Sequence, residues 1–152
     1  MNHSVYPIRR VGKKLVFVFR SVNQEGANPV TKIVGYPRIV RGGHRYHNLE
    51  FGDLKRKSVD FDDMIVTDNG DMRKVLRTVA ATLETFFDEL PNAKVHIYGS
   101  DSVRHAYYHK LIRDYYRFIK TSYNVFGHIN NRIGRFQPNI EYDFIIVAKR
   151  EF

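Results

Sequence analysis

The chain has 152 residues, of which 43% are hydrophobic and 14% aromatic. This composition excludes a disordered chain and suits a single domain, residues 1–152, with a real apolar core. The absence of cysteine excludes disulfides and thiolate metal ligands and fits a reducing compartment. Residues 1–10 lack the apolar run of a signal peptide, and no stretch approaches the roughly 18 apolar residues of a membrane helix. We therefore expect a soluble, cytoplasmic protein with no membrane partner.

The net charge of +9 is distributed unevenly along the chain. Residues 1–57 contain 12 Lys and Arg against 3 Asp and Glu, residues 58–99 contain 4 against 8, and residues 100–152 contain 9 against 5. Basic surfaces attract nucleic acids and acidic proteins, so the charge indicates partners of these two kinds. A basic surface that is merely solvated is the alternative that the charge leaves open.

The first third of the sequence predicts strands. Hydrophobic side chains alternate with a period of two, and segments rich in Gly, Asn and Pro separate the alternating runs. The three strands are expected at residues 13–23, 30–36 and 45–51. A short turn joins the first two, which predicts a β-hairpin, and Gly42-Gly43 breaks the chain before the third. Residues 54–68 are polar and charged, which predicts a loop with one short strand-like piece at residues 64–66.

The remaining sequence predicts two helices and three further strands. Apolar side chains recur at helical spacing over residues 72–90, and Asp71 precedes them as a suitable N-cap. A second helix is expected to begin with Ser100 or Ser102 as its N-cap and to end near residue 122. The further strands are expected at residues 94–98, 125–129 and 141–149.

The order of these elements is β-β-β-α-β-α-β-β. Such an order predicts an α+β fold in which a mostly antiparallel sheet packs on two helices. The sequence shows neither an internal repeat nor a low-complexity linker, which favours one domain over several.

The start of the second helix predicts a phosphate-binding site. Gly99 allows the backbone to leave the preceding strand sharply, and Ser100 and Ser102 bring hydroxyl groups to the first turn. The first amides of a helix have no partner inside it, and Arg104 lies one turn further on. We therefore predict that Gly99, Ser100, Ser102 and Arg104 bind a phosphate. The alternative is that Ser100 only caps the helix and that Arg104 pairs with Asp101 or a carbonyl group.

Four side chains of this helix are candidate catalytic residues. His105 and His109 lie one turn apart on one face, as do Arg104 and Tyr108. Cleavage of RNA at its 2′-hydroxyl needs a base, an acid and a cation, which two histidines and an arginine can provide near neutral pH. Tyr108 would orient the reacting group or share the proton transfer. Alternatively, the histidines are ordinary surface residues, and a metal site would need a further ligand. We expect neither a metal nor a cofactor.

Arginine and tyrosine residues alternate further along the same helix. Basic side chains hold phosphates and aromatic rings stack on bases, so this mixture is typical of nucleic-acid binding. The predicted nucleic-acid-binding residues are Arg113, Tyr116, Arg117 and Lys120. The alternative is that one tyrosine of each adjacent pair packs into the core.

The chain resembles a family of small bacterial proteins of about this length, found largely in the Bacteroidetes and classed as a domain of unknown function. The residues that carry the resemblance are Asn48–Asp53, Asn69–Asp71, Lys74–Ala80, Gly99 and Ser100 with Arg104 and Tyr108, and Glu141–Phe144. That family usually has Thr at the positions of Asp101 and His105. The resemblance implies a shared fold, and the family's genes are similar in size and setting to partners in two-gene toxin–antitoxin operons.

Three hypotheses about function follow from these patterns. The favoured one is a toxin-like component of a bacterial two-gene module, toxin–antitoxin or defence, that binds RNA and cleaves it without a metal. An acidic antitoxin protein would then be its partner. The second is a non-catalytic module that binds nucleic acid or an acidic protein. The third is an enzyme that acts on a nucleotide and holds its phosphates at the Gly99-Ser100 turn. The sequence leaves the oligomeric state open.

Overall fold

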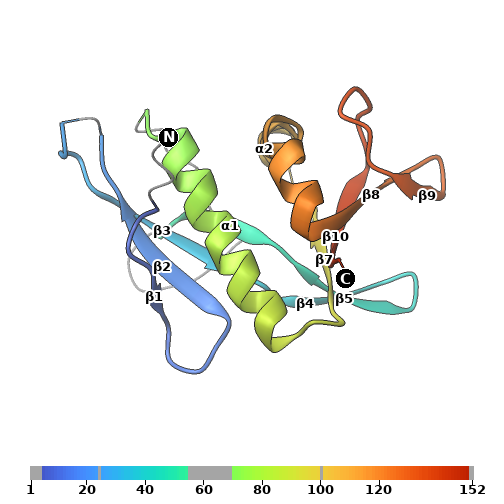
Figure 1. Cartoon of the computed structure of the whole chain (residues 1–152), viewed down its shortest axis with the longest axis horizontal. Helices are drawn as coiled ribbons and strands as arrows, with labels where there is room; N and C mark the ends of the chain where they lie inside the picture. Colours follow the sequence, from blue (N-terminus) through green and yellow to red (C-terminus); the bar gives the residue numbers. More distant parts are fainter. Residues whose placement is uncertain (1–4, 24, 55–69, 100, 151–152) are drawn as a thin grey trace. The chain divides into compact units, whose positions relative to one another are not determined.

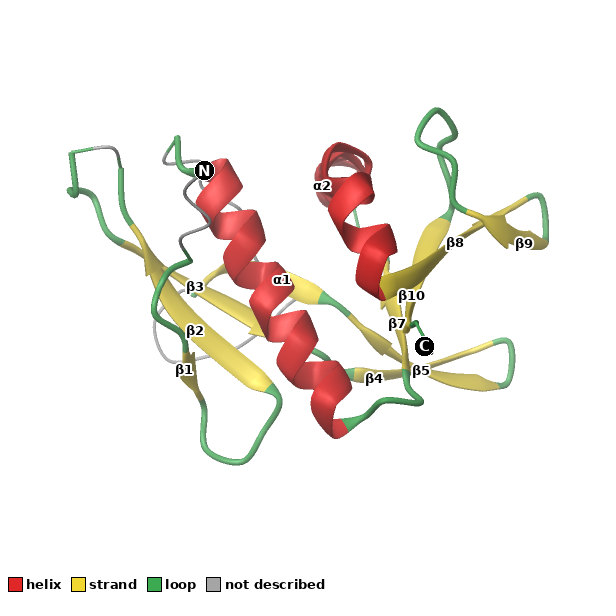
Figure 2. Cartoon of the chain, viewed as in Figure 1, coloured by secondary structure: helices red, strands yellow, loops and turns green. Residues whose placement is uncertain are grey.

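The structure is a computed structural model that describes residues 5–23, 25–54, 70–99 and 101–150 (Figure 1). The chain divides into two compact units. Residues 1–36 and 50–89 belong to the first unit, and residues 37–49 and 90–152 belong to the second. Figure 2 shows that each unit combines one helix with strands. The chain therefore enters the second unit, returns to the first and crosses again.

The predicted α+β class is confirmed. The described residues form two helices and two mostly antiparallel sheets, with the strands divided between the sheets rather than gathered in one. Among the described residues, six strands precede the first helix, one strand lies between the helices, and three follow the second helix. The single domain stays a prediction.

In its described residues, the first unit is a four-stranded antiparallel sheet with one helix. Its sheet has the order β1-β2-β3-β6. The elements are β1 (Arg9–Arg10), β2 (Val16–Ser21), β3 (Val30–Gly35), β6 (Glu50–Asp53) and α1 (Met72–Glu89). β2 and β3 form the predicted hairpin, and α1 covers nearly the predicted span. The helix packs through its apolar face, where the ring of Tyr36 stacks on Phe86 at 4.5 Å between ring centroids.

Polar contacts also connect the elements of the first unit. Lys32 and Asp53 lie opposite each other on β3 and β6, and their side chains form a buried ion pair at 2.5 Å. Asp71 precedes α1, and its carbonyl accepts the N–H of Val75, as expected for the residue at the cap position. The carboxylate of Asp71 accepts hydrogen bonds from Ser21 and from the hydroxyl of Tyr6. The Asp71 side chain therefore connects the start of α1 to β2 of the sheet.

The second unit is a six-stranded sheet with one helix. The sheet has the order β4-β5-β7-β10-β8-β9, and the β5–β7 pair is its one parallel pair within the described part of the chain. The elements are β4 (Arg38–Arg41), β5 (His44–Asn48), β7 (Lys94–Ile97), α2 (Ser102–Ser122), β8 (Tyr123–Ile129), β9 (Arg132–Arg135) and β10 (Phe144–Lys149). The second predicted helix and the three strands after residue 90 are confirmed.

Two hairpins of the second unit were not predicted. β4 and β5 are joined by Gly42-Gly43, and β8 and β9 by Asn130-Asn131. All four turn residues have positive φ, between 53° and 78°. Two successive residues with positive φ are typical of a tight turn whose twist matches that of the two strands. The sequence analysis recognised only a chain break at the first turn and a loop at the second.

The prediction of a single strand at residues 45–51 is wrong. It is divided into β5 and β6, which belong to different sheets. Leu49 separates them, and its N–H donates to the carbonyl of His96 at 2.7 Å. Alternation with a period of two identifies an extended chain but carries no information about its neighbours. The strand-like piece predicted at residues 64–66 lies outside the described residues.

Candidate functional site

Asp101 is the N-cap of α2. Its backbone is extended, with φ −130° and ψ 166°, and its carboxylate accepts the N–H of Arg104 at 2.8 Å. The Nε of Arg104 donates to the other carboxylate oxygen at 2.9 Å. The Arg104 amide, followed by its guanidinium, lowers the pKa of the Asp101 carboxyl. The prediction of a serine cap is therefore wrong for Ser102, which is the first helical residue, while Ser100 lies outside the described residues.

In the predicted phosphate site, the carboxylate of Asp101 lies where the phosphate was expected to bind. The Asp101 carboxylate holds the Arg104 amide and guanidinium, the two groups expected to receive a phosphate. Gly99 lies so close to the first turn that an added Cβ would approach the backbone nitrogen of His105 to 2.2 Å. Glycine is thus required for the close packing of strand and helix. The arrangement matches the alternative in which Arg104 pairs with Asp101, and the phosphate-binding role of Gly99, Ser102 and Arg104 stays a prediction.

The two candidate catalytic histidines form hydrogen bonds with the backbone of the same residue, Tyr142. The N–H of Tyr142 donates to Nε2 of His109, and Nε2 of His105 donates to the carbonyl of Tyr142, both at 2.8 Å. A nitrogen that accepts carries no proton, whereas one that donates must carry one. His109 is therefore neutral and protonated at Nδ1, and His105 is protonated at Nε2. The rings lie 5.2 Å apart and together fix the chain that leads into β10.

Burial lowers the pKa of His109, and the neighbouring His105 lowers it further. The ring is only 4% exposed, and its Nε2 is already occupied by the Tyr142 amide. Tyr108 is 1% exposed and lies in the core of the unit. The structure thus brings Arg104, His105 and His109 near one another in a packed region. Their catalytic role stays a prediction.

Tyr142 explains why α2 packs on one particular face of the sheet. Its ring stacks on His109, with 5.9 Å between centroids and 8° between planes. The same ring covers Gly127 of β8, where an added Cβ would lie 2.2 Å from ring carbon Cδ1. Gly127 is paired with Ile145 of β10, so these residues share a face of the sheet. That face is therefore the one that α2 covers.

One strip of the exposed side of α2 is basic. Four exposed side chains recur at helical spacing and form what we call the α2 basic face, namely Lys110, Arg113, Arg117 and Lys120. In the described part of the chain, none of the four forms an ion pair. Half-buried Tyr116 packs against Phe136, with 5.0 Å between ring centroids and 53° between ring planes, and the Lys120 ammonium lies 5.6 Å from the Tyr116 ring. The predicted nucleic-acid-binding residues therefore lie along one side of the helix, and the spacing adds Lys110 to them.

The opposite face of the sheet carries a row of rings in contact that the sequence analysis missed. Tyr46, His96, Phe144 and His128 come from β5, β7, β10 and β8, and successive centroids lie 3.6, 4.6 and 4.5 Å apart. The Arg41 guanidinium lies 5.1 Å from the Phe144 ring. No signal in the sequence could have revealed this row, because its members come from strands distant in the chain.

His96 is the most isolated titratable group of this row. It is fully buried, and neither ring nitrogen has a hydrogen-bond partner among the described residues. Burial, followed by the charges of Arg41, His128 and Lys94, lowers the pKa of His96 to about 4. The ring is therefore neutral at pH 7 and acts there as an apolar, stacked side chain.

Within residues 5–23, 25–54, 70–99 and 101–150, no three His, Asp or Glu side chains lie close enough to hold a metal ion. No helix in the same ranges is long and apolar enough to cross a membrane.

A comparison with protein families identifies a matching family. The profile described as "Family of unknown function (DUF6934)" matches residues 2–150. The chain belongs to DUF6934. No curated protein and no solved structure matches it. The DUF6934 match spans both units, so α2, its basic face and the row of rings all lie within the matched residues.

The contact of His109 with Tyr142 predicts a specific loss of stability in this DUF6934 chain. His109→Leu leaves a buried N–H without an acceptor, which should lower the free energy of unfolding by about 1–3 kcal/mol. His109→Gln offers an amide oxygen in its place and should recover much of that loss. Urea unfolding measures both, with exposed Lys110→Ala as a control expected to change stability by less than about 0.5 kcal/mol. Equal losses for the Leu and Gln variants would contradict the role of the hydrogen bond.

The lowered pKa of His96 predicts a pH-dependent stability. The ring has an ordinary pKa of 6.5 in the unfolded chain and one of about 4 in the folded protein, so the unfolded state binds more protons between these values. The stabilisation is complete above pH 6.5 and is lost as the pH falls towards 4, by roughly 3 kcal/mol.

His96→Phe keeps the stacked ring but removes the titration. The free energy of unfolding of this variant, measured by urea unfolding from pH 4 to pH 7, should fall less steeply on acidification than that of the wild type. His109 titrates in the same direction and is present in both proteins, so the difference isolates His96. Parallel curves for the two proteins would show that the ring does not titrate as described.

Proposed function

We propose that this protein binds RNA along the α2 basic face and acts as the toxin-like component of a bacterial two-gene module. The observation that carries the proposal is the row of four exposed cations without ion pairs in the described chain. From Lys110 to Lys120 the row extends about 15 Å along the helix axis. That length exceeds a single phosphate group, so the row suits a chain of phosphates.

A ring beside the cations favours a single-stranded nucleic acid. Tyr116 is half-buried and held against Phe136, and Lys120 lies next to its ring. Base stacking on a fixed aromatic ring, combined with nearby cations, is how proteins commonly bind unpaired RNA. An acidic antitoxin would be attracted by the same four charges and would then compete with RNA for them.

Binding has more support than cleavage. His105 and His109 would have to release the Tyr142 backbone before their Nε2 atoms could transfer protons to or from RNA. The toxin-like role rests on the resemblance to a bacterial family, found largely in the Bacteroidetes, whose genes are similar in setting to toxin–antitoxin partners.

The proposal predicts that charge on α2 controls the affinity for RNA. Arg113→Gln combined with Arg117→Gln should weaken binding of a 12-nucleotide single-stranded RNA by at least about tenfold and reduce the salt dependence of binding by one to two counterions, roughly. Fluorescence anisotropy at several salt concentrations measures both. Lys13→Gln combined with Lys14→Gln removes the same charge from exposed positions of the first unit and should have little effect. Equal losses in the two double variants would assign the affinity to net charge alone.

The toxin-like role predicts growth inhibition. Expression of the wild-type chain alone should slow bacterial growth, and the Arg113→Gln/Arg117→Gln variant should slow it less at the same protein level. Growth curves with immunodetection of the protein measure this. A wild-type chain without effect on growth would contradict the toxin-like role and leave RNA binding to be judged by the binding assay.

A further inference from the structure

The sheet of the second unit ends on one side at β9. Within the described part of the chain, β9 pairs with β8 and with no other strand. All four of its residues, Arg132–Arg135, are exposed, and Ile133 is 57% exposed although its side chain is large and apolar. An edge strand presents backbone N–H and C=O groups that can pair with another chain. A further strand can therefore be added to the sheet at β9.

The register shows which backbone groups of β9 face outwards. Phe136 continues the strand, and its N–H donates to the carbonyl of Val125 of β8 at 3.0 Å. Hydrogen-bonded positions alternate along an antiparallel pair, so Gly134 also bonds to β8, whereas Ile133 directs its N–H and C=O away from it. The exposed Ile133 thus offers both a backbone donor and a backbone acceptor at the edge.

A recess of about 590 Å³ lies beside the same strand. β9 and β10 lie on the two sides of β8, so residues 137–142, which connect them, cross β8. Tyr142 covers Gly127, and the connection therefore crosses on the face that α2 covers. Gly134 is paired with Gly127 and shares this face, and an added Cβ at Gly134 would meet no atom within 4 Å. The space over Gly134 is therefore open.

The recess is suited to an apolar side chain. Half-buried Ile129 and Ile140 line it together with Tyr142. The Tyr142 ring is packed against His109 and Gly127, and the residue is only 5% exposed. It leaves too little ring surface for a nucleobase to stack on, whereas a Phe or Leu side chain would bury apolar surface against the two isoleucines.

The two arginines of β9 indicate an acidic partner. Arg132 lies on the same face as the recess and Arg135 on the other face, because successive side chains of a strand alternate. Neither forms an ion pair within the described chain, and none of the residues that line the recess is acidic. Side chains of an added strand alternate too, so one carboxylate on each of its faces can meet one arginine. Two copies of β9 would instead bring only positive charges together, which disfavours their pairing.

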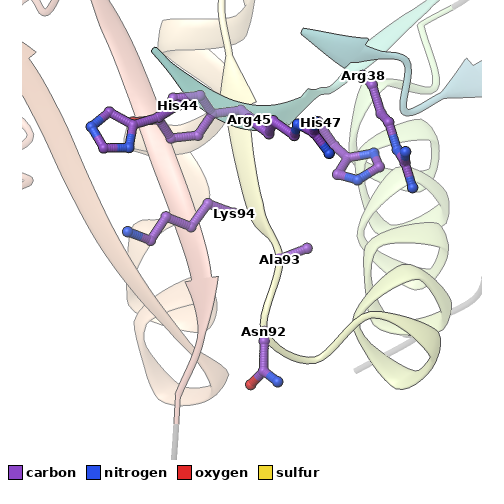
Figure 3. A pocket seen from close by; sticks show the side chains of 8 residues that line it. Arg38, His44, Arg45, His47, Asn92, Ala93 and Lys94 are labelled. Carbon is purple, nitrogen blue, oxygen red and sulfur yellow. The ribbon is translucent and has the colours of Figure 1, made fainter. Parts of the chain in front are cut away.

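The opposite edge of the same sheet serves as a control. Figure 3 shows that the side chains of His44 and Lys94 lie on one side of β5 and those of Arg38 and His47 on the other, as the alternation of the strands requires. The charges beside β5 therefore do not meet in one space. Arg38 and Arg45 are exposed at this edge and match the two arginines of β9 in charge.

We infer that an extended acidic segment of a partner protein adds to the sheet as a strand along β9, with one apolar side chain in the recess over Gly134. Backbone hydrogen bonds to Ile133 provide affinity, and carboxylates beside Arg132 and Arg135 select an acidic segment. The inference goes beyond the RNA binding proposed for α2 and does not depend on it, because it concerns another surface and a peptide ligand.

Calorimetric titration of the full chain with the acetylated and amidated peptide Thr-Glu-Phe-Val-Glu-Thr tests the inference. Paired antiparallel with β9, this peptide places Phe opposite Gly134, Val opposite Ile133 and one Glu opposite each arginine. Replacing Val by N-methylvaline removes the N–H that faces Ile133 and should weaken binding at least about tenfold. Failure of the parent peptide to bind at millimolar concentration, or equal binding of the methylated peptide, would overturn the inference.

Variants place the peptide on β9. Gly134→Val fills the recess where an added Cβ meets no atom, so it should weaken binding by about tenfold and remove the preference for the parent peptide over one with Ala in place of Phe. Arg132→Gln combined with Arg135→Gln should weaken binding about threefold or more, whereas Arg38→Gln combined with Arg45→Gln should have little effect. Thermal unfolding checks that each variant is folded. Unchanged affinity in Gly134→Val, or equal losses in the two arginine pairs, would overturn the inference.

The Arg113→Gln/Arg117→Gln variant separates β9 from the α2 basic face. It should bind the peptide like the wild type, and Gly134→Val should bind RNA like the wild type. Loss of peptide binding in the α2 variant would assign the peptide to α2 and overturn the inference. A dimer of the chain in light scattering that the peptide dissociates would identify a second copy as the occupant of β9 and would overturn it as well.

Discussion

The arrangement of the second unit depends on two hydrogen bonds between histidine side chains and the backbone of Tyr142. His109 accepts its N–H, His105 donates to its carbonyl, and the tyrosine ring covers Gly127. One residue thereby connects α2, the chain leading into β10 and the middle of the sheet. A buried amide that loses its acceptor is costly, so this contact constrains the helix strongly. The same contact occupies the ring nitrogens that acid–base catalysis would need, and it leaves the outer side of α2 to interact with other molecules.

The buried cations of the protein form ion pairs with carboxylates, whereas the exposed cations of α2 do not form them within the described residues. In the first unit the buried ammonium of Lys32 is paired with Asp53, and at the start of α2 the guanidinium of Arg104 is paired with Asp101. The cations of the α2 basic face have no such partner among the described residues. They meet solvent, and anionic ligands are the class that would neutralise them. The proposed RNA binding rests on this difference.

Local chemistry made much of the α2 region predictable. Arg113 and Arg117 lie on the same exposed side because helical spacing requires it, and Gly99 marks a close approach of backbones. The predicted serine cap was wrong because Asp101, which stands between two serines, also has a side chain suited to capping. The partner of His105 and His109 was not predictable, because Tyr142 lies more than thirty residues away and its backbone offers no side-chain signal.

The sequence by itself determined the α+β class, the β2–β3 hairpin and the spans of both helices, because these follow from periodicity and from turn residues close together in the chain. Only the tertiary structure decided that residues 45–51 divide between two sheets and that rings from four strands form one row. A strand carries the same alternation whichever neighbour it pairs with, so pairing partners and the spaces between them are set by contacts distant in sequence.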